Sequence, residues 1–186
     1  MKNPFRFISQ FTLKPRTVGA VLPSSKYLAK KMLDGIDFSN AKYIVEYGPG
    51  TGVFTDKIIE KRSNVAVLMI IENNIEFYKL LTERYKHEDN LIIIHGSAAN
   101  VDKYMTLHNM PYIDYVVSGL PFASLPKDVS NDILTKTKKH LKEDGKFITF
   151  QYTTFKKEFI NQYFEQIDIK REYRNMPPAY VFSCGN

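Results

Sequence analysis

The chain has 186 residues, of which 44% are hydrophobic and 25% charged, a composition that fits one folded domain and excludes a disordered or collagen-like protein. The net charge is +6, and the whole excess lies in residues 1–42, which hold eight basic and two acidic residues. One cysteine excludes an internal disulfide, the four histidines lack metal-ligand spacing, and no apolar run approaches the ~20 residues of a membrane-spanning helix.

The N-terminal segment is basic and amphipathic. Drawn as a helix, residues 5–14 place three phenylalanines and Ile8 on one side and basic or polar residues on the other, and Pro15 limits the continuation. Such a helix can lie in a membrane interface, so we expect residues 1–31 to contact an anionic phospholipid surface. The alternative is that the phenylalanines pack on the domain. Because no secretory signal is recognisable, we expect a cytoplasmic protein that is bound peripherally to the membrane.

Helices and strands alternate after this segment. The predicted helices run from Ser24 or Ser25 to residue 33, and over residues 53–61, 75–85, 129–141 (closed by Gly145) and 156–164. The predicted strands cover residues 42–47, 65–71, 91–94, 112–117, 146–152, 167–173 and 180–183. The last connection is too short for a helical crossover, so its two strands should pair antiparallel. We therefore predict an α/β fold, a doubly wound and mostly parallel seven-stranded sheet with one antiparallel strand, preceded by N-terminal helices.

A glycine loop follows the first strand. The segment Glu46-Tyr-Gly-Pro-Gly-Thr-Gly52 lets the backbone turn sharply and lets a ligand approach without Cβ atoms in the way. The dinucleotide pattern needs a glycine at position 53, where the chain has valine, and the Gly-Lys-Ser/Thr of a phosphate-binding loop is absent. The loop therefore suits a nucleotide-like ligand without a pyrophosphate.

Ligand-type residues also follow the next three strands. Glu72 ends the second strand, where an acid can accept both hydroxyls of a ribose. The third strand ends in His95-Gly-Ser-Ala98, which suits an adenine edge, and the fourth motif runs from Asp114 to Phe122. Because ligands bind beyond the carboxyl ends of parallel strands, these motifs predict one binding site.

These motifs resemble the class I S-adenosylmethionine-dependent methyltransferases over about residues 15–186. The chain is most similar to the bacterial phosphatidylethanolamine N-methyltransferases, in residues 18–25, 46–55, 117–121 and 175–179. It also resembles the ribosomal RNA adenine N6 dimethyltransferases. Those enzymes carry Asn-Leu-Pro-Tyr where this chain has Gly119-Leu-Pro-Phe122, and a C-terminal RNA-binding domain for which 186 residues leave no room. We therefore expect nucleic acid not to be the partner.

The resemblance implies roles for named residues. Gly48, Gly50 and Gly52 would pack against the amino-acid part of S-adenosylmethionine, Glu72 would hold the ribose, and Ser97 would replace an aspartate that contacts the adenine amino group. The implied cofactor-binding residues are Ser24, Ser25, Glu46, Gly48, Gly50, Gly52, Glu72, Asn73, Ser97, Ala98 and Ser118, and the implied methyl-transfer residues are Ser118, Gly119 and Phe122. Tyr152 and Tyr180, near strand ends, are candidate substrate-binding residues, with core packing as the alternative. No general base is identified.

The resulting hypothesis is an N-methyltransferase that methylates the amine of phosphatidylethanolamine at the membrane surface and releases S-adenosylhomocysteine. Residues 1–35 would form the membrane contact and a lid over the cofactor, residues 36–186 the methyltransferase domain, and the protein would be a monomer without a metal. Two alternatives stay open. One is an enzyme resembling the RNA adenine N6-methyltransferases, and the other is a non-catalytic module that binds the cofactor or a membrane.

Overall fold

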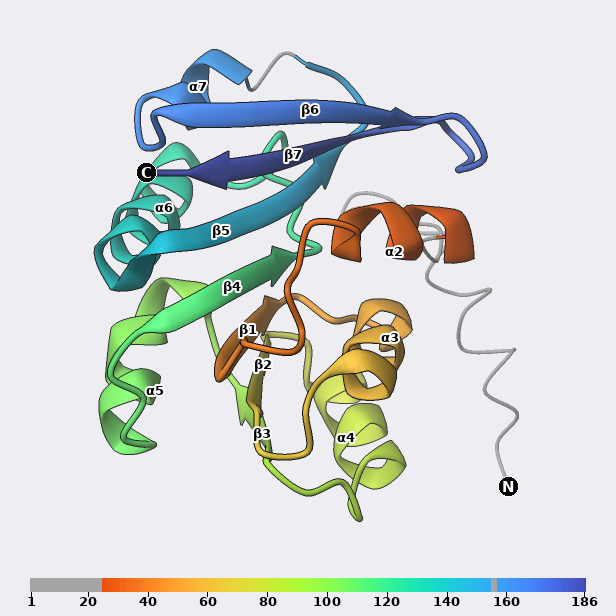
Figure 1. Ribbon diagram of the computed structural model, residues 1–186, viewed down its shortest axis with the longest axis vertical. Helices are drawn as coiled ribbons and strands as arrows, with labels where there is room; N and C mark the ends of the chain where they lie inside the picture. The colour runs from red at the N-terminus through yellow and green to blue at the C-terminus, as the bar shows by residue number, and fades with distance from the viewer. Residues whose placement is uncertain (1–24, 155–156) are drawn as a thin grey trace.

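Seven strands form one sheet in the computed structural model, which describes residues 25–154 and 157–186 (Figure 1). The strands are β1 Tyr43–Tyr47, β2 Val67–Glu72, β3 Leu91–His95, β4 Ile113–Ser118, β5 Leu141–Gln151, β6 Gln166–Glu172 and β7 Ala179–Gly185. Their order in the sheet is β3-β2-β1-β4-β5-β7-β6. Strand β7 is antiparallel to both neighbours and the other pairs are parallel, so the predicted sheet is confirmed.

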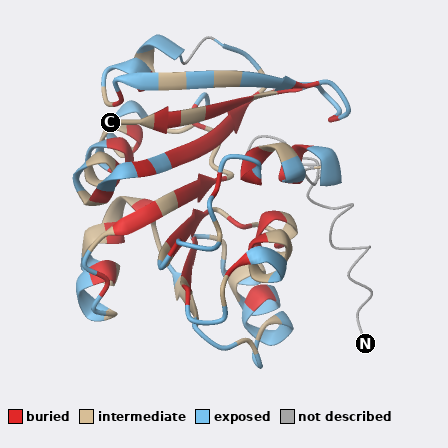
Figure 2. Cartoon of the chain, viewed as in Figure 1, coloured by how far each residue is buried: buried red, intermediate tan, exposed pale blue. Residues whose placement is uncertain are grey.

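Helices cover both faces of this sheet. The helices α2 Lys26–Leu33, α3 Val53–Lys61 and α4 Ile75–Arg84 pack on one face, and α5 Val101–Leu107, α6 Lys127–His140 and α7 Lys157–Asn161 pack on the other. The short 3-10 helix η1 Ala98–Asn100 precedes α5. Because β2 is covered on both faces, its residues form a nearly continuous apolar run, whereas the edge strand β6 alternates between exposed and half-buried positions (Figure 2).

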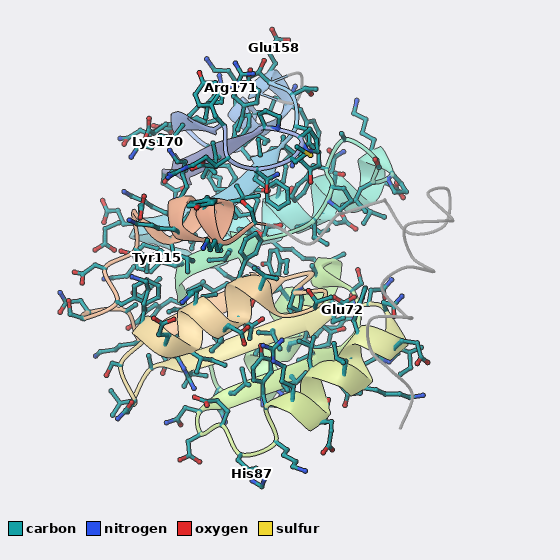
Figure 3. All side chains as sticks on the ribbon, turned by 90° about the vertical axis from the view of Figure 1, so that its right-hand side faces the viewer. Glu72, His87, Tyr115, Glu158, Lys170 and Arg171 are labelled. Atoms are coloured by element: carbon teal, nitrogen blue, oxygen red, sulfur yellow. The ribbon has the colours of Figure 1, made fainter. Side chains whose placement is uncertain are left out.

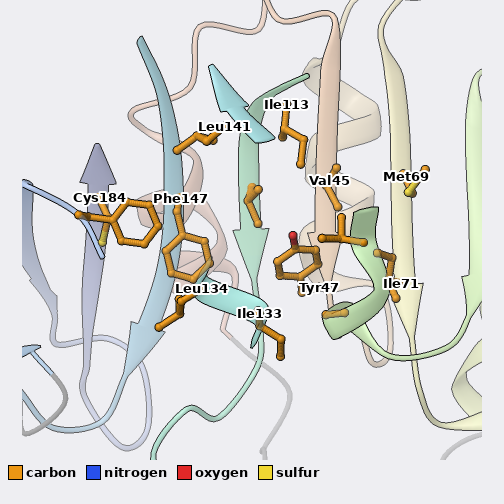
Figure 4. Packing of buried hydrophobic residues seen from close by; sticks show 14 of the residues in the cluster. Val45, Tyr47, Met69, Ile71, Ile113, Ile133, Leu134, Leu141, Phe147 and Cys184 are labelled. Carbon is orange, nitrogen blue, oxygen red and sulfur yellow. The ribbon is translucent and has the colours of Figure 1, made fainter. Parts of the chain in front are cut away.

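The core is filled by apolar side chains from both faces of the central strands. Figure 4 shows part of this core, with Tyr47, Leu134 and Phe147 labelled. Phe147 lies edge-on to Phe122, with ring centroids 5.9 Å apart, and is stacked on Phe164 at 5.4 Å. The side-chain hydroxyl of Tyr47 has a hydrogen-bond partner in this core, because its oxygen lies 3.1 Å from Thr137 Oγ1. This buried hydrogen bond fixes α6 over the end of β1, close to the glycine loop.

Several predicted boundaries hold to within two residues, and α3 matches its prediction. The Ser25 hydroxyl accepts a hydrogen bond from the backbone N–H of Leu28 at 3.1 Å, which confirms Ser25 as the N-cap residue of α2. The predicted helix over residues 5–14 and the candidate Ser24 lie outside the described residues. Within residues 25–154 and 157–186, no helix has the length and apolar character needed to cross a membrane.

In the middle of the chain, one helix was missed and one helix end was predicted wrongly. Helix α5 was not predicted, because its seven residues are too few for a clear periodicity. Gly145 does not close α6, which ends at His140 and leads directly into β5. Gly145 instead lies inside β5 where the register with β4 shifts, and a Cβ atom there would stand 2.8 Å from the Asp114 carbonyl oxygen. The glycine therefore permits a close backbone approach rather than a helix end.

Candidate functional site

The glycine loop joins the ends of three neighbouring strands. Gly48, Gly50 and Gly52 have φ angles of +63°, +56° and +87°, values that only glycine adopts at little cost. The Gly48 N–H donates to the Ile71 carbonyl at 2.9 Å, and the Gly119 N–H donates to the Tyr47 carbonyl at 2.8 Å. The loop after β1 is thus fixed to the last residues of β2 on one side and to the residue after β4 on the other.

The three glycines do not have the same surroundings, and their contacts with a ligand stay a prediction. A Cβ atom at Gly48 would stand 2.8 Å from a Leu120 methyl carbon, and one at Gly52 would stand 2.5 Å from the Tyr85 hydroxyl. These two glycines make room for protein side chains. Gly50 has no atom within 4 Å of the same position, so it alone presents open space to a ligand.

Glu72 holds the glycine loop from the end of β2. One carboxylate oxygen, Oε2, accepts from the Gly50 N–H at 3.0 Å, and the other, Oε1, accepts from the Asn74 N–H at 2.8 Å. The side chain is 6% exposed, and burial raises the pKa of this carboxyl. Each oxygen keeps a further lone pair, so both can also accept a ligand hydroxyl. Figure 3 views the molecule from the side at which β4, β5 and β6 end, and labels Glu72.

The two residues after Glu72, Asn73 and Asn74, have different surroundings. Asn73 is exposed, and its carbonyl oxygen lies 3.3 Å from Nε2 of His95. Asn74, which was not predicted as a site residue, caps α4 by accepting from the N–H groups of Glu76 and Phe77. Its position before a predicted helix, with an acid in the next residues, was the available signal. The second strand end is therefore held by Glu72 and Asn74.

Glu46 lies beneath the glycine loop and is fully buried. Its Oε2 accepts from the Thr55 hydroxyl at 2.7 Å, whereas Oε1 is buried without a hydrogen-bond partner among the described residues. Burial raises the pKa of Glu46 to about 8. A buried carboxyl oxygen without a partner, below the glycine loop, fits a ligand that carries hydrogen-bonding groups. S-Adenosylmethionine is such a ligand.

The raised pKa of Glu46 leads to a testable pH dependence of stability. The folded protein keeps a proton on Glu46 that the unfolded chain releases above its ordinary pKa of 4.5. Glu46 therefore contributes stability at low pH that is lost as the pH rises toward 8, by ~1.4 kcal/mol per pH unit. Glu46→Gln cannot titrate and should lack this slope. Urea unfolding of both proteins between about pH 5 and pH 8 measures the difference, and equal slopes would contradict it.

The end of β4 is buried and nearly uncharged. Ser118 is fully buried, with its hydroxyl oxygen 3.3 Å from the Leu120 N–H and its carbonyl oxygen 3.3 Å from the Thr149 hydroxyl. Phe122 was predicted to lie beside the methyl-transfer site, but its ring has no exposed surface and belongs to the core beneath α6. Asp114, at the opposite end of β4, accepts from the N–H groups of Lys42 and Tyr43 and so joins β4 to the start of β1.

The end of β3 contributes two of the predicted residues. The Ser97 hydroxyl accepts from the Ala99 N–H at 3.2 Å and thereby caps η1, and Ala98 is buried. His95 is exposed, and its ring centroid lies 5.2 Å from that of Tyr78. Ser97 is therefore placed at the predicted strand end, and its contact with an adenine group stays a prediction.

Tyr152 and Tyr180 lie near the same edge but on opposite faces of the sheet. Tyr152 packs edge-on against Phe150, with centroids 5.7 Å apart, on the face of α2 and α3. Tyr180 is half-buried on the face of α6. Their role in substrate binding stays a prediction. Gln151, which pairs with Tyr180 in the sheet, was not predicted; it is buried, and its Nε2 has no partner among the described residues.

A third unpredicted residue, Asn175, joins the start of α2 to the loop before β7. Its Oδ1 accepts from the Ser25 N–H at 3.0 Å, and its Nδ2 donates to the Pro177 carbonyl at 2.8 Å. Asn175 begins one of the segments that carry the family resemblance, so the sequence held a signal for it. Because Asn175 is buried, this bond fixes the N-terminal end of α2 at the edge where the glycine loop lies.

Comparisons with known proteins indicate the family to which the chain belongs. The family model described as ribosomal RNA adenine dimethylase matches residues 21–174. An ornithine lipid N-methyltransferase of Singulisphaera acidiphila is 29% identical over 99% of this chain and 96% of that protein. A ribosomal RNA small subunit methyltransferase A of a Sulfurihydrogenibium species is 30% identical over 59% of this chain and only 42% of that protein.

A solved structure supports the fold. An S-adenosylmethionine-dependent methyltransferase from Aquifex aeolicus has a TM-score of 0.66 at 12% identity, and the match covers 95% of this chain and 97% of that one. At this identity the likeness concerns the fold alone. Together with the family model, which covers most of the chain, it leads to one conclusion: the protein belongs to the ribosomal RNA adenine dimethylase family of class I S-adenosylmethionine-dependent methyltransferases.

Proposed function

We propose that this methyltransferase acts on the amine of a membrane lipid, with phosphatidylethanolamine or an ornithine lipid as acceptor. The observation that carries the proposal is the match over nearly the whole of both chains to a protein named ornithine lipid N-methyltransferase. The match to the ribosomal RNA methyltransferase covers less than half of that relative. Phosphatidylethanolamine and ornithine lipids both present a primary amine on a lipid headgroup, so the shared chemistry is N-methylation of a lipid amine.

The surroundings of Gly119 weigh against the asparagine with which the adenine dimethyltransferases grip their acceptor. A Cβ atom at this position would stand 2.7 Å from the Gly48 carbonyl oxygen, closer than real Cβ atoms approach a backbone oxygen. The adenine N6 dimethyltransferases that resemble this chain carry an asparagine at this position. The backbone of this chain leaves no space for that side chain. The glycine is a packing requirement of the two loops.

This packing predicts that Gly119→Asn does not create an RNA methyltransferase. The side chain must displace the glycine loop, so we expect a loss of about 1–3 kcal/mol in the free energy of unfolding and weaker cofactor binding. Gly35→Asn is the matched control, because a Cβ atom at Gly35 meets nothing within 4 Å. Unfolding curves and methyl incorporation into RNA test both variants. An unchanged stability, or gained RNA methylation, would contradict the interpretation.

The chain's residues are proposed to divide the work as follows. Gly50, Glu72, Ser97 and Ser25 hold the cofactor, and Ser118, Gly119 and Gln151 line the acceptor side. When bound, S-adenosylmethionine supplies a methyl group from its sulfonium to the amine nitrogen, leaving S-adenosylhomocysteine and a methylated ammonium. Ser118 and Gln151 are buried and uncharged. Such surroundings lower the pKa of an ammonium and so favour the neutral amine, which alone can accept the methyl group.

Gln151 is the residue we assign to orientation of the headgroup. Its Nε2 is a buried donor without a partner among the described residues, at the end of the strand next to Ser118. An unpaired buried donor is costly, and an oxygen of the acceptor headgroup would satisfy it.

Residues 1–35 are proposed as the membrane contact and lid, and residues 36–186 as the methyltransferase domain. The protein is proposed to be a peripheral, cytoplasmic monomer.

Methyl transfer from labelled S-adenosylmethionine tests the proposal. The acceptors are vesicles with phosphatidylethanolamine, vesicles with an ornithine lipid, and total RNA, with Gly50→Val as the inactive control. Label in either lipid supports the function and names the headgroup. Label in RNA alone, or in no acceptor while the cofactor still binds, overturns it.

A further inference from the structure

The β6–β7 hairpin and α2 form one exposed surface that combines aromatic, apolar and basic side chains. We infer that this surface docks on an anionic lipid bilayer, an inference that rests on the proposed lipid acceptor. We define the surface by its exposed members. It consists of Lys26, Tyr27 and Lys30 of α2 together with Arg171, Tyr173, Arg174 and Met176 of the hairpin.

Side-chain contacts join the two parts into one surface. The Arg174 guanidinium lies 4.3 Å from the centroid of the Tyr27 ring. Lys31 of α2 lies 3.6 Å from the buried carboxylate of Glu172, which also accepts from Arg174 Nε at 3.3 Å. With the bond between Ser25 and Asn175 described above, these contacts fix the hairpin against the first turns of α2.

The surface lies at the edge of the sheet that carries the candidate site. Tyr180 at the start of β7 pairs with Gln151 at the end of β5, and Thr149 of β5 pairs with Ser118 at the end of β4. In Figure 1 the hairpin and α2 project on the same side as the ends of β4 and β5, and Figure 3, viewed from that side, labels Arg171 and Glu72. Docking through this surface would therefore bring lipid amines to the edge where the cofactor loop lies.

The charge of the surface complements an anionic leaflet. Four basic residues, Lys26, Lys30, Arg171 and Arg174, are exposed on it. The acid within it, Glu172, is buried and already paired with Lys31 and Arg174. Asp34 is exposed at the far end of α2, and Asp168 lies further back along β6, where it pairs with Lys170. The net charge that faces a partner is therefore positive.

The apolar members favour a bilayer over RNA. Tyr173 is 68% exposed and Met176 is 83% exposed, and Met176 is followed by two exposed prolines. An exposed thioether and prolines suit the boundary between headgroups and acyl chains, where tyrosine and arginine also concentrate. Bases of RNA need free aromatic faces for stacking. Here the Arg171 guanidinium already lies over one face of each ring, 4.7 Å from the centroid of Tyr173 and 5.1 Å from that of Tyr180.

A fluorescent probe at Met176 tests the contact directly. The single cysteine of the chain, Cys184, is fully buried, so an environment-sensitive dye can be attached selectively to Met176→Cys. Leu107→Cys is the matched control, because Leu107 is 72% exposed at the end of α5 that points away from the carboxyl ends of the strands. With phosphatidylcholine vesicles containing phosphatidylglycerol, we expect a blue shift at position 176 and none at 107.

A paired substitution removes one charge and one apolar contact from the surface together. Arg171→Gln with Met176→Ser should weaken sedimentation with these vesicles by about tenfold, whereas Lys103→Gln with Leu107→Ser on α5 should not change it. Both pairs lie on exposed positions, and unchanged thermal unfolding checks that the variants fold. No shift at position 176, equal shifts at both positions, or a shift with RNA alone would overturn the docking surface. Binding is measured without cofactor, so its failure is distinct from an absence of lipid methylation, which would overturn the proposed function instead.

Discussion

Gly50→Val is expected to weaken binding of S-adenosylmethionine by about 100-fold or more while the protein still folds. Gly50 alone of the three loop glycines faces open space, so a valine there places two methyl groups where we propose the cofactor approaches. Its φ of +56° adds strain of about 1–2 kcal/mol for any residue with a Cβ atom. Strain lowers stability, whereas occupied space lowers affinity, and the two are measured separately.

Two companion variants separate these effects. Gly50→Ala carries most of the backbone strain but fills less space, so it should lose a similar amount of stability and much less affinity. Gly35→Val adds the same side chain at another open position, away from the strand ends, and should bind the cofactor as the natural protein does. Titration calorimetry and urea unfolding give the two quantities. Full affinity in Gly50→Val would show that the cofactor does not approach this glycine.

The arrangement of the strands could be predicted because local patterns decide it. Apolar runs such as residues 67–71 are explained by burial on both faces, and the short connection before β7 leaves only an antiparallel pairing. The strand ends carry Glu46, Glu72 and Ser118 in one neighbourhood for the same reason, since parallel strands end at one edge. The sequence pattern therefore locates the site.

The roles within the site could not be predicted, because they depend on contacts between distant segments. Gly48 and Gly52 belong to the same motif as Gly50, yet Leu120 and Tyr85 decide that they face protein. Phe122 follows a strand end as a pocket residue would, but the packing of Phe147 buries it. Gln151 shows no pattern in the sequence, and only the absence of a partner for its Nε2 among the described residues makes it a candidate.

Glu72→Gln is expected to weaken cofactor binding by about 100-fold, the second large effect. A carboxylate accepts from both Gly50 and Asn74, at 3.0 and 2.8 Å. A carboxamide has one acceptor oxygen, so its NH₂ group must face one of these N–H groups, and the loop loses a charge-assisted bond of about 1.5–3 kcal/mol. Glu76→Gln, at an exposed position on α4, is the matched control and should bind normally.

Glu72 can hold the loop, contact the ribose, or do both. A thermodynamic cycle that combines one substitution in the protein with one change in the ligand separates these roles. An analogue of S-adenosylhomocysteine without the ribose 2′-hydroxyl should bind the natural protein more weakly than S-adenosylhomocysteine does. If Glu72 accepts from that hydroxyl, the analogue should lose little further affinity in Glu72→Gln, because the partner is already impaired. If the two losses add in full, Glu72 serves only to hold Gly50 and Asn74, and the ribose is bound elsewhere. Non-additivity therefore assigns the ribose contact, and additivity restricts Glu72 to the support of the loop.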